Sequence, residues 1–307
     1  MSTGTRIDRA GLWGAVASFV LWGLMPLYWH QLKVVPSLQI VLHRIVWSAL
    51  LVALWLVVTQ GGGWWRKVKA RPRAAAMLGV TSLLITFNWG LYIWAVNAGH
   101  VIEGSLGYYI NPLVNVVLGV LVLRERLNPA QWVAVALAAA GVLWLTVALG
   151  QLPWIALGLA LSFAAYGLLR KVLAVDAVLG LGVEGAYLFL PALAALVWLE
   201  LSGQGHFTSG WGLGIDLLLV LGGALTALPL IGFAFAVRRV PYTIVGMLQY
   251  ISPTLQLLVG ALVLGEAFPR ERMLGFGLIW LGLAVFAVDG WRQSRHRAPA
   301  PATPMER

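Results

Sequence analysis

The chain contains no cysteine among its 307 residues. This absence excludes disulfide bonds, iron–sulfur clusters and zinc sites with cysteine ligands. Charged residues are also scarce, at 10% of the chain against about 25% in a typical soluble domain. Because hydrophobic residues make up 60% of the chain and the mean hydropathy is +0.85, the composition predicts a polytopic membrane protein.

Sequence signatures of common enzymes are missing as well. The chain has no Walker A pattern, no H-E-x-x-H, no G-x-S-x-G and no pair of carboxylates placed for catalysis. One segment, GLGVEG at residues 180–185, fits the dinucleotide-binding pattern G-x-G-x-x-G. That pattern requires a preceding strand, whereas here a basic loop precedes a membrane-length apolar segment. We therefore expect no enzymatic activity, no catalytic residue, no cofactor and no bound metal ion.

Apolar runs of about 20 residues, the length that crosses a bilayer, recur along the chain. Turn residues and charges separate them. The predicted spans are residues 11–29, 37–58, 74–97, 102–123, 129–149, 153–171, 180–201, 213–237, 243–264 and 271–290. The expected fold is therefore an all-α polytopic membrane protein with ten transmembrane helices in a lipid bilayer.

Basic residues outnumber acidic ones by 21 to 11, and their placement predicts the orientation of the chain. Most of them lie in alternate connections, namely Arg6, Arg9, Arg66, Lys67, Lys69, Arg71, Arg73, Arg124, Arg126, Arg170, Lys171, Arg238, Arg239, Arg292, Arg295, Arg297 and Arg307. The opposite connections hold only Lys33, Arg270 and Arg272. By the positive-inside rule, both termini are expected in the cytoplasm. Because the charge is spread over short loops, we do not expect nucleic acid as a partner.

The two ends of the chain are predicted to lie outside the helical region. Residues 1–10 are expected to form a cytoplasmic N-terminus. The apolar stretch that follows is too long for a signal peptide and has no small-residue cleavage site. Residues 291–307 are polar and proline-rich, which predicts a disordered cytoplasmic tail.

An internal repeat organises the sequence. A shift of 141 residues places YYINPLVNVVLGVLVLRE on QYISPTLQLLVGALVLGE, and a shift of 144 places GAVASFVLWGL on GLALSFAAYGL. The predicted repeats are residues 11–149 and 153–290, with five spans each. An odd number of spans makes the second copy enter the membrane from the opposite side. Such inverted-topology repeats are common in secondary transporters, whose substrate site lies near the midplane.

Each repeat carries polar residues on one face of an otherwise apolar helix. The 141-residue shift pairs two polar stripes, formed by Tyr108, Asn111 and Asn115 and by Gln249, Ser252 and Gln256. Pro112 and Pro253 predict a kink beside each stripe, because proline deprives the carbonyl four residues earlier of its donor. We expect both stripes to bind substrate in a polar cavity at mid-membrane. Alternatively, the amides only join helices by hydrogen bonds of about 0.6–2 kcal/mol each.

Arg44 lies about six residues, or roughly 9 Å, inside the second predicted span. An arginine at such depth costs about 2.5–3.5 kcal/mol on insertion scales and usually faces a partner or a wet cavity. We expect Arg44 and the preceding His43 to bind substrate, with Glu103 as the counter-charge of Arg44. A substrate carboxylate could also pair with Arg44. Alternatively, Arg44 extends to the lipid headgroups.

Glu184, near the inner end of the seventh span, and Glu103 are candidates for proton coupling. The alternative for Glu184 is an ordinary carboxylate at the membrane interface. Asn88 and Asn97 in the third span have no polar partner that the sequence identifies, and we interpret them as packing residues.

Several segments resemble one known family. They are SLGYYINPLVNVVLG, RERLNPAQWVAVALAAAGV, NWGLYIWAVN, LHRIVWS and SFAAYGLLRK. These segments are similar to the RarD branch of the EamA transporters, within the drug/metabolite transporter superfamily, over residues 11–289. The resemblance implies a bacterial inner-membrane protein with ten helices in two inverted halves around a central cavity. It also implies secondary transport of small metabolites or drugs, but it supplies no substrate-binding residues.

The favoured function is a secondary active transporter that exports amino acids, similar metabolites or amphipathic drugs by alternating access. The alternatives are a passive channel for small solutes and a membrane receptor or scaffold that transports nothing. The expected partners are a small-molecule substrate and the lipid bilayer; a homodimer is compatible with the sequence but has no specific support in it. The sequence does not identify the substrate, the coupling ion or the direction of transport.

Overall fold

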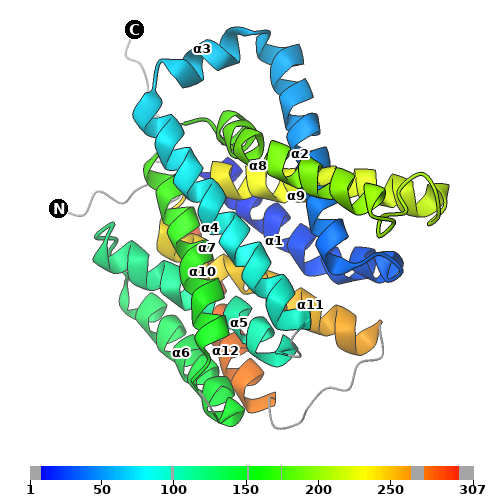
Figure 1. The fold of residues 1–307 in the computed structure, drawn as a ribbon. Helices are drawn as coiled ribbons and strands as arrows, with labels where there is room; N and C mark the ends of the chain where they lie inside the picture. Colours follow the sequence, from blue (N-terminus) through cyan, green and yellow to red (C-terminus); the bar gives the residue numbers. More distant parts are fainter. Residues whose placement is uncertain (1–7, 98–99, 151, 174, 264–272, 297–307) are drawn as a thin grey trace, which may run out of the picture. The chain divides into compact units, whose positions relative to one another are not determined.

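The computed structural model describes residues 8–97, 100–150, 152–173, 175–263 and 273–296 (Figure 1). Regular structure in these ranges is helical, without β-strands. Ten segments are long and apolar enough to cross a membrane, which confirms the predicted all-α membrane fold. The helices of these segments are α1 (Arg9–Trp29), α2 (Ser37–Gln60), α4 (Pro72–Asn97), α5 (Val101–Leu121), α6 (Pro129–Leu149), α7 (Trp154–Val172), α8 (Ala177–Leu201), α9 (Leu213–Val237), α10 (Tyr242–Gln249) with α11 (Ile251–Leu262), and α12 (Met273–His296).

Local sequence explains where helix α6 begins and ends. The Asn128 side chain accepts a hydrogen bond from the backbone N–H of Gln131 at 2.8 Å, and the Gln131 side chain accepts one from the Asn128 N–H at 3.1 Å. Pro129 occupies the first helical position, where its missing N–H has no consequence. Gly150 ends the helix with φ +75°, a conformation that glycine adopts without strain.

The C-terminal helix α12 is longer than its apolar run predicts. It continues to His296, past residue 290 where the disordered tail was expected to begin. Residues 291–296 are therefore helical, and the prediction of disorder was wrong for them. The remainder of that tail, and residues 1–7 of the predicted N-terminal segment, lie outside the described residues.

Proline affects the two related helices differently. The ninth span is divided into α10 and α11 at Tyr250, whose N–H bonds to the carbonyl of Met247 at 3.3 Å. The interruption follows Gln249, whose carbonyl would accept from residue 253 in a regular helix, where proline has no N–H. In the first repeat, α5 continues as one helix through Pro112.

Contacts divide the chain into two compact units. The larger unit, Met1–Glu125 with Leu152–Phe268, contains α1 to α5 and α7 to α11. The smaller unit, Arg126–Gln151 with Pro269–Arg307, contains α6 and α12, which pack on each other. A Cβ atom at Gly141 would lie 2.5 Å from the carbonyl oxygen of Gly275, so these helices approach at glycine. This division differs from the sequence repeat, whose boundaries stay a prediction.

Packing within the larger unit follows the repeat. Helix α5 packs on α7, and its counterpart α11 packs on α1. Likewise, α4 packs on α7 and α8, whereas its counterpart α9 packs on α1 and α2. The remaining main contacts join a helix to its own counterpart, α2 to α8 and α5 to α10. Such an exchange of partners is consistent with two copies related by a two-fold axis.

Contacts also show which helix ends meet in the larger unit. Arg239, after α9, pairs with Asp8 at the start of α1 at 3.6 Å. Lys171, at the end of α7, donates to the carbonyl of Val237 at 2.8 Å. We call this side, which carries most of the basic connections, the basic end. At the opposite end, Gln39 near the start of α2 donates to the carbonyl of Gln204 after α8 at 2.7 Å.

Candidate functional site

A cavity of about 210 Å³ lies inside the larger unit. Seven of the ten spans contribute residues to its described wall, namely α1, α2, α4, α5, α7, α9 and the ninth span, which contributes from both α10 and α11. The residues that α1 and α4 contribute include Trp29 and Tyr92, near their C-terminal ends, whereas α2 and α5 contribute residues near their N-terminal ends. The cavity therefore occupies the half of the unit away from the basic end.

Arg44 is the charged residue in the described wall of this cavity. Its Nε donates to the Oγ1 of Thr226 at 2.9 Å. Its guanidinium carbon lies 4.7 Å from the ring centroid of Trp29 and 5.2 Å from that of Trp89. Cation–π contacts of this kind contribute about 0.5–2 kcal/mol each. The guanidinium is thus held between aromatic rings inside the protein instead of extending to the headgroups.

Arg44 forms no ion pair with a carboxylate of the described residues. The side chain of Glu103, its predicted counter-charge, lies outside the described part of the chain. His43 lies outside the cavity wall, because consecutive residues of a helix point about 100° apart. Its Nδ1 accepts from Trp47 at 3.2 Å and its ring lies 4.7 Å from that of Phe207.

The polar stripe on α5 serves two purposes. Tyr108 and Asn111 line the cavity, and the Nδ2 of Asn111 donates to the carbonyl of Ala160 on α7 at 2.7 Å. Asn115 is fully buried and outside the wall. Its Nδ2 donates to the Oε1 of Gln249 at 2.6 Å and to the Oδ1 of Asn111 at 3.2 Å. The stripe therefore faces the cavity at one end and joins α5 to α10 at the other.

The second stripe lies across the break between α10 and α11. Gln249, Ser252 and Gln256 all line the cavity. The Nε2 of Gln256 donates to the carbonyl of Trp22 at 3.2 Å and to the Oγ of Ser252 at 3.3 Å. The two stripes meet at the Asn115–Gln249 bond, so wall formation and helix joining, which the sequence presented as alternatives, occur together.

Asn88 also lines the cavity, in contrast to its interpretation as a packing residue. Its Nδ2 donates to the carbonyl of Leu159 at 2.8 Å and to the Oγ of Ser162 at 2.9 Å, both on α7. The sequence contained a usable signal, because Asn88 and Tyr92 have the i, i+4 spacing of one helix face. The side chain of Asn97, interpreted in the same way, lies outside the described residues.

Aromatic rings separate the cavity from the basic end. Phe163 and Trp22, which line the cavity, have ring centroids 5.8 Å apart. Beyond them lies Phe233, 5.4 Å from Phe163, and Tyr166 stacks on Phe233 at 6.3 Å. We call these four residues the aromatic floor.

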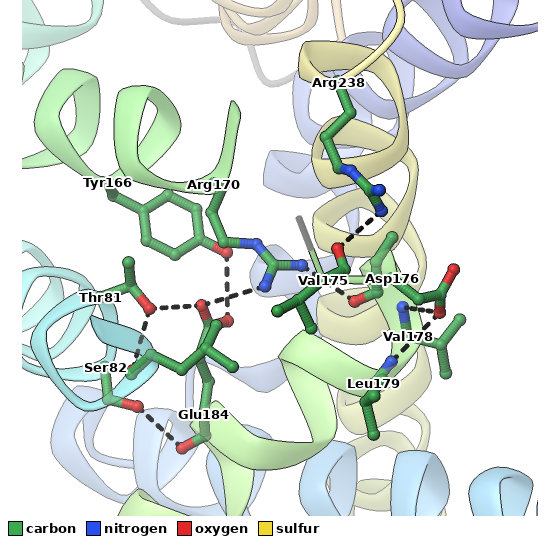
Figure 2. Close-up of polar contacts among 12 residues, drawn as sticks. Thr81, Ser82, Tyr166, Arg170, Val175, Asp176, Val178, Leu179, Glu184 and Arg238 are labelled. Atoms are coloured by element: carbon green, nitrogen blue, oxygen red, sulfur yellow. Dashed lines mark hydrogen bonds and ion pairs between the residues drawn. The ribbon is translucent and has the colours of Figure 1, made fainter. Parts of the chain in front are cut away.

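Glu184 on α8 is a buried acid that contacts Tyr166 of this floor (Figure 2). The Oε1 of Glu184 accepts from the hydroxyl of Thr81 at 2.6 Å and lies 3.6 Å from the Nη1 of Arg170. Its Oε2 accepts from the hydroxyl of Tyr166 at 3.3 Å. Glu184 and Arg170 are each only 2% exposed. This burial contradicts the alternative of an ordinary carboxylate at the interface. No pattern in the sequence indicated Arg170 as its partner.

Glu125 links the two repeats at the basic end. Its carboxylate accepts from the backbone N–H groups of Tyr242 at 2.6 Å and Thr243 at 2.8 Å, at the start of α10. Negative charge is favourable there because the first N–H groups of a helix have no partner within the helix. Lys171 lies 3.8 Å from the same carboxylate.

Comparisons with known proteins agree on one family. The EamA-like transporter family matches residues 9–147. An uncharacterized transporter of Pseudomonas aeruginosa is 46% identical, with 95% of this chain and 98% of the relative covered. A protein named RarD from Streptomyces exfoliatus is 45% identical, with 94% of this chain and 91% of the relative covered. A protein named RarD from Escherichia coli is 40% identical, with 92% of this chain and 95% of the relative covered.

The fold has a counterpart among solved structures. One crystal structure matches with a TM-score of 0.71 at 20% sequence identity, and it covers 94% of this chain and 100% of its own. At this identity the likeness concerns the fold alone. The relatives named above, which match nearly end to end, show that this multi-pass membrane protein belongs to the EamA-like transporter family, among the proteins named RarD.

Proposed function

We propose that the protein is a secondary active transporter that exports small amphipathic molecules with a carboxylate group, such as amino acids or similar metabolites. The observation that carries this proposal is Arg44, a cation inside the cavity that pairs with no carboxylate of the described residues. An uncompensated buried charge is costly, and a bound carboxylate would offset that cost with charge-assisted hydrogen bonds.

The rest of the wall supports an amphipathic substrate. Trp29, Trp89 and Tyr92 offer aromatic surface beside Arg44. Asn88 and Gln249 add amide groups to the same wall. Binding sites for small molecules typically combine such an apolar wall with a few polar groups that fix orientation. Amphipathic drugs with an acidic group would satisfy the same wall.

The asymmetry of the two ends supports alternating access. The cavity occupies one half of the larger unit, while the aromatic floor and Glu125 close the other half. A passive channel would need a continuous pore, and a receptor or scaffold would not need matching stripes on both repeats. With the basic end in the cytoplasm of a bacterial inner membrane and both termini there, this arrangement is an outward-facing state.

A pair of probes that differ only in charge tests the proposal. N-acetylleucine carries a carboxylate, and N-acetylleucinamide has the same body without it. We expect the carboxylate alone to raise the unfolding temperature of the purified protein, since a ligand that binds only the folded state stabilises it. The shift should vanish in Arg44→Gln and persist in Arg239→Gln, which removes an exposed arginine. Equal shifts with both probes would contradict the assigned substrate class.

A further inference from the structure

Glu184 and Arg170 form a buried pair that lies outside the wall of the substrate cavity. In the structure, both residues lie inside candidate membrane spans, Arg170 near the end of its span, and both are almost inaccessible. A buried ion pair contributes little net stability compared with apolar residues of similar volume. Ionisable residues within membrane helices therefore suggest a function by default, and proton relay is a common one.

Arg170 is confined at the junction of α7 and α8. Its Nη2 donates to the carbonyl of Ala177 at 3.0 Å (Figure 2). A Cβ atom at Gly180 would lie only 1.8 Å from its Nη1, so the guanidinium occupies the space that a side chain would need. Arg170 can therefore reach water only if the ends of α7 and α8 move apart.

The groups around the Glu184 carboxylate come from three helices. From α7, Tyr166 and Arg170 face it, and from α4 the hydroxyl of Thr81 does. Helix α2 presents apolar side chains to this part of α8, with a Leu56 methyl 2.5 Å from a Cβ placed on Gly182. Arg238, which follows α9, donates from its Nη1 to the carbonyl of Val175 at 2.6 Å. Arg170 is therefore the cation that balances Glu184 among the described residues.

Tyr166 connects this pair to the cavity. Its hydroxyl donates to Glu184, and its ring stacks on Phe233, which packs against Phe163 in the cavity wall. A change in the charge of Glu184 therefore acts directly on Tyr166, which belongs to the aromatic floor.

We infer that Glu184 is a proton-binding site that couples export to proton entry, which makes the protein a proton antiporter; this inference rests on the proposed function. A proton from the outer solution passes from the cavity to the carboxylate by way of the Tyr166 hydroxyl, which belongs to the aromatic floor and bonds to Glu184. Its binding leaves Arg170 without its counter-charge. That imbalance favours separation of the helices at the basic end, where Arg170 meets water. Glu184 then releases the proton to the cytoplasmic side, and substrate binding at Arg44 accompanies the return. One proton is bound and released per cycle, with no other bond changed.

A single-cysteine experiment tests the switch without a substrate. Because the chain has no cysteine, Val245→Cys on α10, fully buried near the basic end, reports opening through its rate of reaction with a membrane-impermeant maleimide. Gly62→Cys, in the exposed connection after α2, corrects for the effect of pH on thiol reactivity. Both are measured in inside-out vesicles between pH 6 and pH 8.5.

The inference predicts that the corrected rate rises at least severalfold as the pH falls. Glu184→Gln, which imitates the protonated acid, should give the high rate at every pH. Glu125→Gln is the matched control, because it removes another acid at the same end and should raise the rate while keeping the pH dependence. Tyr166→Phe leaves the carboxylate in place and should shift only the midpoint. A native rate that does not change with pH, or the same pH curve in Glu184→Gln, would overturn the inference.

Flux separates this inference from the function on which it rests. In proteoliposomes, a radiolabelled amino acid that stabilises the protein should accumulate against its gradient when a pH gradient is imposed. Saturable exchange without such accumulation would refute proton coupling and leave the transporter intact. Absence of saturable exchange with any stabilising amino acid would refute the proposed function itself.

Discussion

The larger unit contains two arginines in opposite situations. Arg44 lies in a cavity between aromatic rings, without a carboxylate partner among the described residues. Arg170 is sealed beneath the aromatic floor and faces the carboxylate of Glu184. A charge inside a membrane protein has to be balanced, and the source of the balancing charge differs between these two sites. We assign the balance of Arg44 to the substrate and that of Arg170 to an acid that binds protons.

Removing the internal partner should have the largest effect. Arg170→Met leaves Glu184 buried without its cation, and breaking a buried pair in this way costs about 3–5 kcal/mol. We expect a clear drop in the thermal unfolding temperature of the purified protein at pH 8. The deficit should shrink at acidic pH, where the carboxylate binds a proton, and in the double variant Arg170→Met, Glu184→Leu. A double variant as unstable as the single one would show that the cost comes from packing and not from charge.

Removing an amide from either stripe should abolish transport without preventing membrane insertion. Gln249→Leu breaks a hydrogen bond between α5 and α10, and Asn111→Leu breaks one between α5 and α7. Leaving a buried polar partner unsatisfied costs about 1–3 kcal/mol, roughly 5- to 150-fold in an equilibrium constant. Flux in proteoliposomes and membrane yield measure the two effects. Thr59→Val, which removes an exposed hydroxyl bonded within its own helix, is the control. Unchanged flux in both leucine variants would remove the stripes from the site.

A methyl group at Gly180 should disturb Arg170 specifically. Gly180→Ala places a Cβ against the guanidinium, and such overpacking typically costs about 1–3 kcal/mol. Gly90→Ala, inside α4 with nothing within 4 Å of its Cβ, is the matched control, and helix propensity should make it neutral or stabilising by up to about 1 kcal/mol. Thermal unfolding of both proteins checks the difference. Equal behaviour would mean that Arg170 moves aside freely.

The aromatic contacts of Arg44 should have the smallest effect. Trp89→Leu keeps an apolar side chain but removes one cation–π contact, worth about 0.5–2 kcal/mol. We expect the apparent affinity for the transported amino acid to weaken a few-fold, with the maximal rate retained. Trp198→Leu, an exposed tryptophan on α8, should not change it. The apparent affinity follows from the concentration dependence of flux. Loss of all flux in Trp89→Leu would contradict a supporting role.

The sequence was sufficient for features that depend on neighbours along the chain. Apolar length predicted the ten spans, and the 141-residue shift paired stripes that the structure brings together at Asn115 and Gln249. It also predicted a kink beside both Pro112 and Pro253, but not that the ninth span would divide at Tyr250 while α5 continues through Pro112 as one helix.

Contacts between distant helices were beyond the sequence. Thr226 follows Arg44 by 182 residues and Glu184 follows Thr81 by 103, so no local pattern could pair them. The hydrogen-bond partners of Asn88 on α7 were likewise beyond the sequence, although its i, i+4 spacing with Tyr92 indicated a shared helix face. His43 and Arg44 are adjacent in sequence but point to different surroundings, which only packing decides.

Counterflow in proteoliposomes tests the assignment of Arg44 most directly. Vesicles loaded with an unlabelled amino acid that stabilises the protein should take up the radiolabelled form transiently when the native protein is present. Arg44→Lys should retain part of this uptake, because it keeps the positive charge, and Arg44→Gln should show none. Native counterflow in Arg44→Gln would contradict the account, since the substrate would then not need the cation.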